Sequence, residues 1–195
     1  RAEQGEVDKA DRKRDPRTLI GRDPMKRGLY IGRFQPYHLG HQAVLQKIVE
    51  EVDEVVVGLG SAQASHTVEN PFTAGERISM IWPALRELDA TCYVIPLVDM
   101  ERNAVWVSHV EAMTPNFDVV YSNNPLVVQL FVEAGTEVRR PPMYRREIYS
   151  GTAIRRMILA GDEGWRRLVP PSVASVIEEI GGIERLRNVS QGDQE

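Results

Sequence analysis

The sequence predicts an α/β fold in which a parallel sheet is doubly wound by helices. Two observations indicate it between about residue 27 and residue 140: short apolar runs that suit strands, and longer amphipathic segments that alternate with them. Strands that alternate with helices in this way form parallel sheets with right-handed crossovers. A third observation, the helical pattern that continues without strands after Gly151, predicts extra C-terminal helices.

The strands are predicted from runs of β-branched, aromatic and aliphatic residues, such as residues 29–31, 55–57 and 93–95. Five strands are predicted in total, at residues 27–33, 54–60, 91–97, 117–122 and 136–140. The last of these is short.

The helices are predicted from apolar stripes opposite polar faces. Val44, Leu45 and Ile48 form such a stripe in the first helix, which should therefore pack on the sheet. The predicted helices lie at residues 39–51, 73–88, 103–113, 124–134, 151–160, 172–180 and 182–189. Gly161 and the Pro170-Pro171 pair are predicted to interrupt the C-terminal helices.

Length and composition predict one compact domain. A chain of 195 residues with 42% hydrophobic and 27% charged residues can bury a sizeable core. We predict a single domain at residues 25–190 and a short tail at residues 191–195. In residues 1–24, acidic and basic side chains alternate with almost no apolar periodicity, which predicts a mobile extension.

Charge and hydropathy argue against several classes of partner. A formal net charge of −4 argues against a broad basic surface for nucleic acid. No apolar run reaches the length of a membrane span and no signal-peptide pattern opens the chain, so we expect no membrane partner and a cytoplasmic location. The single cysteine, Cys92, excludes an internal disulfide and is predicted to be a buried strand residue without a catalytic role.

The segment that follows the first strand, residues 32–41, reads Gly-Arg-Phe-Gln-Pro-Tyr-His-Leu-Gly-His. Gly32 is expected to leave room for a ligand at the backbone, and Pro36 fixes φ so that the chain turns before a helix begins near Leu39. His38 and His41 lie one helical turn apart, where the free N–H groups of a helix start favour an anion. The segment therefore predicts a cradle for phosphate, most simply a triphosphate.

Two histidines at this spacing also suit a zinc site or a structured turn. A zinc site needs further ligands, and the remaining candidates, Cys92, His66 and His109, have no metal-like spacing. The phosphate interpretation is therefore favoured.

A second motif, at residues 149–156, reads Tyr-Ser-Gly-Thr-Ala-Ile-Arg-Arg. Ser150 or Thr152 is predicted to cap a helix, with Arg155 one turn inside it. A capped helix start offers hydroxyls and amides to a phosphate, and an arginine at this spacing can add two parallel hydrogen bonds. Taken alone, the motif also suits an ordinary capped helix with a solvated arginine.

The first motif resembles the His-x-Gly-His signature of the nucleotidyltransferase superfamily, which has a Rossmann-like fold, and the second resembles its Ser-x-Thr-x-x-Arg motif. With the segment from Gly58 to Arg77, the chain closely resembles the archaeal type of nicotinamide mononucleotide adenylyltransferase, from about Lys26 to about Arg187. It departs at Glu69, where some relatives have an arginine, so no phosphate contact is assigned there. The alternative for this segment is a polar loop that leads into a helix from Thr73, with Arg77 bracing that loop.

The resemblance implies transfer of the adenylyl group of ATP to nicotinamide mononucleotide, giving NAD and pyrophosphate without a covalent enzyme intermediate. Mg²⁺ is implied as the cofactor, held mainly by the phosphates, and a homo-oligomer, typically a hexamer, as the assembly. The implied catalytic residues are Arg33, His38, His41 and Arg155. The implied ATP-binding residues are Gly32, Arg33, Phe34, His38, His41, Ser150, Gly151, Thr152 and Arg155.

Three further residues are candidates for binding the mononucleotide. Trp106 can stack on the pyridinium ring, Asn103 can pair with the carboxamide, and Asp99 can hold a ribose or amide group. The alternative for Trp106 is core packing, because its helix neighbours Val110 and Met113, together with Val105, are predicted core residues. Preference between nicotinamide and nicotinate stays open.

Two rival functions remain at this point. The nearer is another transferase of the superfamily, with phosphopantetheine, a flavin nucleotide or a phosphoalcohol as acceptor. The Ser-Ala-Gln-x-Ser-His-Thr loop at residues 61–67 and Trp106 argue against it. The more distant rival is a non-catalytic nucleotide-binding regulator, for which altered histidines or loss of Arg155 would be expected.

Overall fold

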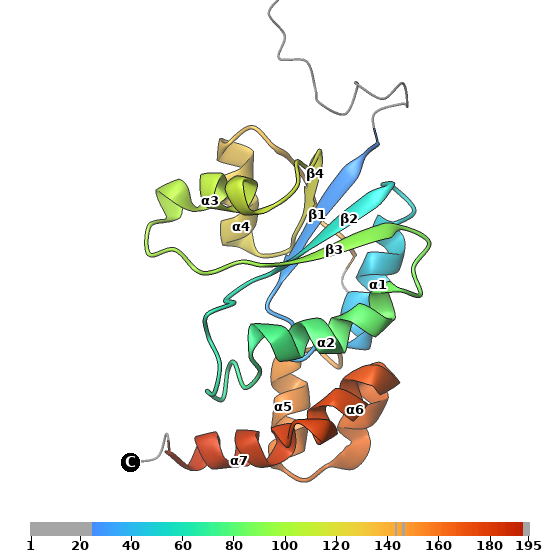
Figure 1. The fold of residues 1–195 in the computed structure, drawn as a ribbon, viewed down its shortest axis with the longest axis vertical. Helices are drawn as coiled ribbons and strands as arrows, with labels where there is room; N and C mark the ends of the chain where they lie inside the picture. Colours follow the sequence, from blue (N-terminus) through green and yellow to red (C-terminus); the bar gives the residue numbers. More distant parts are fainter. Residues whose placement is uncertain (1–24, 143, 146, 193–195) are drawn as a thin grey trace, which may run out of the picture.

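The computed structural model describes residues 25–142, 144–145 and 147–192 (Figure 1). Five parallel strands form one sheet in the order β3-β2-β1-β4-β5. The strands are β1 (Arg27–Gly32), β2 (Glu54–Leu59), β3 (Thr91–Pro96), β4 (Val119–Tyr121) and β5 (Glu137–Arg139). This order confirms the doubly wound α/β prediction, and it places the topological switch point, where ligands bind in such sheets, beside the carboxyl end of β1.

Helices cover both faces of the sheet and one of its ends (Figure 1). On one face lie α1 (Leu39–Ile48) and α2 (Ala74–Leu85), and on the other lie α3 (Trp106–Met113) and α4 (Pro125–Glu133). The C-terminal helices gather at one end, below α2 in the view. They are α5 (Gly151–Leu159), the 3-10 helix η3 (Glu163–Leu168), α6 (Pro171–Glu179) and α7 (Gly182–Gly192).

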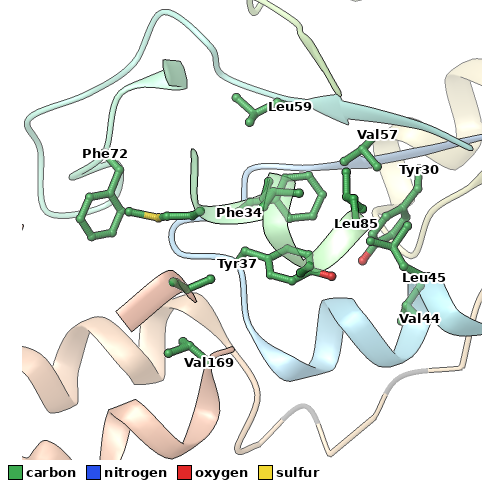
Figure 2. Close-up of a cluster of buried hydrophobic side chains, with 14 of the residues drawn as sticks. Tyr30, Phe34, Tyr37, Val44, Leu45, Val57, Leu59, Phe72, Leu85 and Val169 are labelled. Carbon is green, nitrogen blue, oxygen red and sulfur yellow. The ribbon is translucent and has the colours of Figure 1, made fainter. Parts of the chain in front are cut away.

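Two apolar cores follow from the alternation of side chains along each strand. In the larger core, Tyr30 and Val57 from the sheet pack with Leu45 of α1 and Leu85 of α2, next to Phe34 (Figure 2). In the smaller core, strand residues on the opposite face pack with α3 and α4. Its buried members are Leu29, Val56, Leu97, Val110, Val120, Val127 and Phe131. The two cores hold the sheet between the helices, and the loops at its carboxyl end emerge from this fixed sheet.

Several predicted boundaries were wrong. The helix predicted at residues 103–113 begins as a 3-10 turn, η2 (Asn103–Val105), and Val105 and Met113 are exposed rather than core residues. The Pro170-Pro171 pair lies at the junction of η3 and α6, as predicted, but α6 begins at Pro171, one residue earlier than predicted, because proline suits a first helical turn. The helix η3 was missed. Cys92 lies in β3, half-buried.

The predicted extension at residues 1–24 and the last three residues of the predicted tail lie outside the described residues, and α7 continues to Gly192. None of the helices in the described ranges is long and apolar enough to cross a membrane.

A two-point ion pair ties α7 to the start of α2. The Arg185 guanidinium donates to both carboxylate oxygens of Glu76 at 2.7 and 2.8 Å, and to the carbonyl oxygen of Pro71 at 3.2 Å. Glu76 also accepts from the backbone N–H of Thr73 in the capping box of α2. Arg185 and this capping contact hold the pKa of Glu76 below its usual value.

We expect Arg185→Ala to lower the free energy of unfolding at pH 7 by about 1–3 kcal/mol, because a charge-assisted pair is lost. The pKa of Glu76 is lower in the folded than in the unfolded state, so this stabilisation is present above the ordinary carboxylate pKa and lost as the pH falls through the folded value. Urea unfolding at pH 7 and pH 4 measures it. The exposed Arg187→Ala is the control, and an equal loss in both variants at pH 7 would contradict the assignment.

Candidate active site

The turn after β1 is shaped by Phe34. Its φ of 52° is left-handed, and its ring folds back over Gly32, where a Cβ atom would lie 2.7 Å from the ring. The expectation that Gly32 leaves this space to a ligand was therefore wrong: the space is filled by Phe34, which is 1% exposed. The role of both residues in binding ATP stays a prediction.

His38 and His41 contact each other directly. His38 caps α1, and its Nδ1 accepts the backbone N–H of His41 at 3.3 Å, while Nδ1 of His41 accepts the backbone N–H of His38 at the same distance. Their rings stack with centroids 3.5 Å apart. Burial lowers the pKa of His38 to about 4, and burial together with His38 holds the pKa of His41 well below its usual value. The predicted helix start is confirmed; the reciprocal cap was missed, although histidines at N-cap and N3 have capping-box spacing.

The second motif packs onto this turn. Ser150 caps α5 by accepting the N–H of Ala153 at 3.1 Å, as predicted. Arg155 is buried and donates from Nη1 to the carbonyl oxygen of Gln35 at 2.7 Å and from Nη2 to Thr152 at 3.3 Å. Its Nε is buried with no partner among the described residues. The alternative of a solvated arginine is wrong, because this side chain joins two segments 120 residues apart in sequence.

Gly151 allows α5 to approach the turn so closely. A Cβ atom at this position would lie 2.7 Å from the carbonyl oxygen of Gln35 and 3.1 Å from Nη1 of Arg155. The backbone oxygen cannot move aside without displacing the turn, so any side chain here forces the two motifs apart.

We expect Gly151→Ala to lower kcat/KM for ATP by about tenfold or more, because displacement of a binding group by about 1 Å is enough for such a loss. Steady-state kinetics with varied ATP measure it. Gly75→Ala in α2 is the matched control, because a Cβ atom there meets nothing within 4 Å. Unchanged kinetics in Gly151→Ala would show that the close approach is not needed.

Two buried side chains brace the turn from the other side. Arg77, which is fully buried, donates to the carbonyl oxygens of Arg33, Gly60 and Ser61 at 2.7, 2.8 and 3.0 Å. The Gln35 amide pairs with both the N–H and the carbonyl of Phe72 at 3.0 and 2.9 Å. Arg77 is thus a brace, as the alternative interpretation held. The role of Gln35 was missed, and no local sequence pattern indicates it.

Two cavities meet at the histidines. The larger, of about 590 Å³, is lined mainly by aromatic and amide side chains. The smaller, of about 170 Å³, is lined by Arg33, Thr152 and Arg155 among others. His38, His41 and Gly151 line both. The lining residues of the larger cavity to which the sequence assigned no ligand role are Tyr30, Gly40, Val44, Asn123, Asn124, Pro125, Tyr144 and Tyr149.

Asp99, Asn103 and Trp106, the three candidates for binding the mononucleotide, have different surroundings, and no side-chain contact between them is seen among the described residues. Asp99 pairs with Gln63, accepting from its amide at 2.9 Å and donating its own backbone N–H at 3.0 Å, and its charge acts on Arg77 beside the turn. Trp106 is half-buried and lies edge-on to Phe131, with centroids 5.6 Å apart. Asn103 is exposed, and neither Asn103 nor Trp106 lines the two cavities.

Comparison with known proteins identifies the family. A family model described as Cytidylyltransferase-like matches residues 29–157. A nicotinamide-nucleotide adenylyltransferase of Methanothrix thermoacetophila is 69% identical over 169 residues, covering 87% of this chain and 99% of that protein. The chain belongs to the nicotinamide-nucleotide adenylyltransferases of the cytidylyltransferase-like family.

As a nicotinamide-nucleotide adenylyltransferase, the chain is an enzyme of the nucleotidyltransferase type that acts in NAD biosynthesis. The adenylyltransferase of Haloarcula marismortui is 62% identical, over 86% of this chain and 88% of that protein.

Two solved adenylyltransferases share the fold. A bifunctional NMN adenylyltransferase/ADP ribose pyrophosphatase of Francisella tularensis, complexed with AMP and a manganese ion, has a TM-score of 0.67 at 19% identity, over 87% of this chain and 53% of that one. The nicotinic acid mononucleotide adenylyltransferase of Plasmodium falciparum has a TM-score of 0.60 at 12% identity, over 82% and 98%.

Proposed function

We propose that adenylyl transfer from ATP to nicotinamide mononucleotide takes place in the two joined cavities. The single observation that carries the proposal is their common wall of His38, His41 and Gly151. A large cavity with aromatic and amide walls suits a nucleoside, and a small one with two arginines suits a polyphosphate. The adenosine therefore occupies the larger cavity and the phosphates the smaller.

The chain supplies positioning and charge stabilisation. His38 and His41 donate to the α- to γ-phosphates, Arg33 and Arg155 to the polyphosphate and the leaving group, and backbone amides near Phe34 to the α-phosphate. The phosphate of the mononucleotide attacks the α-phosphorus in line, the bond to the β-phosphate oxygen breaks, and pyrophosphate leaves with the electron pair. No base is needed because the nucleophile is already an anion.

We propose Mg²⁺ as the divalent ion. Within the described residues, no group of three or more His, Cys, Asp or Glu side chains is arranged to hold a metal. By the family resemblance, the phosphates would supply most of its ligands, and Mg²⁺ would neutralise charge on the polyphosphate. The manganese ion that accompanies AMP in the Francisella protein supports a divalent cation in this reaction.

For the acceptor, Trp106 is proposed to stack on the pyridinium ring of the mononucleotide. Asn103 is proposed to pair with its carboxamide, and Asp99 to hold a ribose or amide group. We expect Trp106→Ala to raise KM for the mononucleotide about fivefold to thirtyfold, which corresponds to loss of one cation–π contact. Initial rates with each substrate varied in turn measure it, and KM for ATP should change less. Equal effects on both substrates would return Trp106 to a packing role against Phe131.

An acceptor panel tests the proposed function. The chain is incubated with ATP, Mg²⁺ and one acceptor at a time: nicotinamide mononucleotide, nicotinate mononucleotide, phosphopantetheine, flavin mononucleotide or a phosphoalcohol. We expect pyrophosphate release with NAD as the product of the first. Pyrophosphate release with another acceptor alone would favour the nearer rival, and ATP binding without release would favour the regulator.

Assembly into a homo-oligomer, hexameric by family resemblance, stays a proposal. Large apolar side chains on α3 and α4 are exposed, which supports contacts between subunits. They are Met113, Leu126 and Val132. A cytoplasmic location likewise stays a prediction.

A further inference from the structure

Arg77 ties the turn after β1 to the loop after β2. Its side chain is fully buried, and all four of its hydrogen-bond acceptors are backbone carbonyl oxygens. One acceptor is Arg33 in the turn after β1, two are Gly60 and Ser61 in the loop after β2, and the fourth is Thr73 at the start of α2. A buried guanidinium is costly unless its N–H groups are paired, and hydrogen bonds from a charged donor are strong. The turn and the loop are therefore held at one buried point.

Both segments have left-handed backbone next to the carbonyls that Arg77 binds. Phe34, directly after Arg33, has a φ of 52°, and Ser61 has a φ of 49°. This conformation is unfavourable for residues with a side chain, and it persists only where surrounding contacts hold it. Arg77 binds the carbonyl of the peptide that precedes Phe34 and the carbonyl of Ser61 itself. A ligand that orders one segment therefore favours the position of Arg77 that orders the other.

The loop after β2 is joined in turn to the loop after β3. Ala62 donates its backbone N–H to the carbonyl oxygen of Leu97 at 2.9 Å. The Gln63 amide pairs with Asp99 through two hydrogen bonds of 2.9 and 3.0 Å. Burial lowers the pKa of Arg77 to about 10, and the charge of Asp99 opposes this effect. The contacts thus run from the first motif to the loop that carries Asp99.

We infer that Arg77 is a positioning residue that couples the two substrate sites, so that ATP bound at the turn after β1 favours binding of the mononucleotide beside the loop after β3. A ligand that orders one segment lowers the entropy cost of ordering the segments joined to it. Because coupling of binding is reciprocal, the mononucleotide favours ATP by the same factor. The assignment of the two sites rests on the proposed function, whereas the link between the loops does not.

Isothermal titration calorimetry of the full chain measures this coupling. Kd for nicotinamide mononucleotide is determined with and without a saturating non-hydrolysable ATP analogue and Mg²⁺, in the wild type and in Arg77→Lys. Lysine keeps the charge but lacks the planar fork that holds carbonyl oxygens in two segments at once. We expect the analogue to tighten binding of the mononucleotide about fivefold or more in the wild type. In Arg77→Lys this factor should fall by about twofold or more, the size expected for a residue on a coupling path.

Two control variants separate coupling from general effects. Arg86→Lys makes the same substitution at an exposed position just after α2. Arg185→Ala removes the tie to Glu76 and leaves the acceptors of Arg77 in place. Both controls should keep the wild-type factor. A wild type without coupling, equal factors in wild type and Arg77→Lys, or an equal loss in Arg185→Ala would overturn the inference.

Gln63→Ala interrupts the same path at an exposed side chain, so it keeps the inference testable if Arg77→Lys does not fold. It removes the pairing with Asp99 and leaves the contacts of Arg77 with the turn. The coupling factor should again fall by about twofold or more. An unchanged factor in a folded Gln63→Ala protein would contradict a path through this loop.

Amide hydrogen exchange, followed by NMR, tests the path without the mononucleotide. The N–H groups of Ala62 and Asp99 are hydrogen-bonded between the loops after β2 and β3, so their exchange reports opening of these loops. The ATP analogue alone should slow both in the wild type and not in Arg77→Lys. Exchange that is unchanged in the wild type, or slowed equally in the variant, would overturn the inference.

The two possible failures are distinguishable. Absence of NAD synthesis by the wild-type chain would refute the proposed function. A wild type that makes NAD but shows the same coupling as Arg77→Lys would refute only the role of Arg77.

Discussion

Replacement of His41 with alanine should lower kcat for NAD formation by about a hundredfold to a thousandfold, the usual loss when one preorganised donor to a developing charge is removed. His41 lines both cavities, and the aromatic rings of Phe34 and Tyr37 pack against its imidazole. The effect should fall mainly on kcat, because the donor acts on charge that moves during the transfer.

Gln46→Ala is the control for this variant, because Gln46 is exposed on the same helix and lines neither cavity. Thermal melting should be recorded for both, since loss of the capping contact alone lowers stability. Turnover close to wild type in a folded His41→Ala protein would remove this histidine from the mechanism.

Replacement of Arg155 with alanine should lower kcat/KM for ATP by about a hundredfold to a thousandfold. Its Nη1 and Nη2 donate to Gln35 and Thr152, and each of these nitrogens carries a second N–H, so the guanidinium that lines the small cavity can still donate to a phosphate. Burial, and then the charge of Arg33, lower the pKa of Arg155. A bound anion would offset both effects, because it would stabilise the charged guanidinium. Loss of the side chain removes both a phosphate donor and the tie between the motifs.

The neighbour Arg156 supplies the matched control. It lies on the same helix but is exposed, and it lines neither cavity, so Arg156→Ala should leave kcat/KM within about twofold of wild type, as expected of a surface charge away from the ligand. Arg155→Lys separates charge from geometry: a lysine cannot make the same forked contacts, and it should recover only part of the loss. Equal kinetics in the two alanine variants would show that Arg155 has no special role.

The fold was predictable because its signals are local. Runs such as residues 55–57 indicate strands by composition, and the stripe of Val44, Leu45 and Ile48 indicates the face that α1 buries. The strand order was not predictable in the same way, because pairing of β1 with both β2 and β4 depends on residues far apart in sequence. Helix ends were misplaced where, as at residues 103–105, a 3-10 turn replaces the first α-turn.

The site was predictable in its chemistry and less so in its contacts. The two motifs indicated the histidines, Ser150 and Arg155, but the tie from Arg155 to a backbone carbonyl depends on how α5 lies against the turn. The two hydrogen bonds between Gln35 and Phe72 likewise join residues that are far apart in sequence. The walls of the larger cavity come from five separate segments, so no single stretch of sequence predicts this cavity.

The central claim is that the two motifs act on one polyphosphate, and a crystal structure with a non-hydrolysable ATP analogue and Mg²⁺ tests it most directly. The polyphosphate should lie in the small cavity, with Nε2 of His38 and His41 and a guanidinium nitrogen of Arg155 each about 3 Å from a phosphate oxygen. The adenine ring should lie in the larger cavity. A polyphosphate that contacts only one of the two motifs, or that lies outside the small cavity, would contradict the claim.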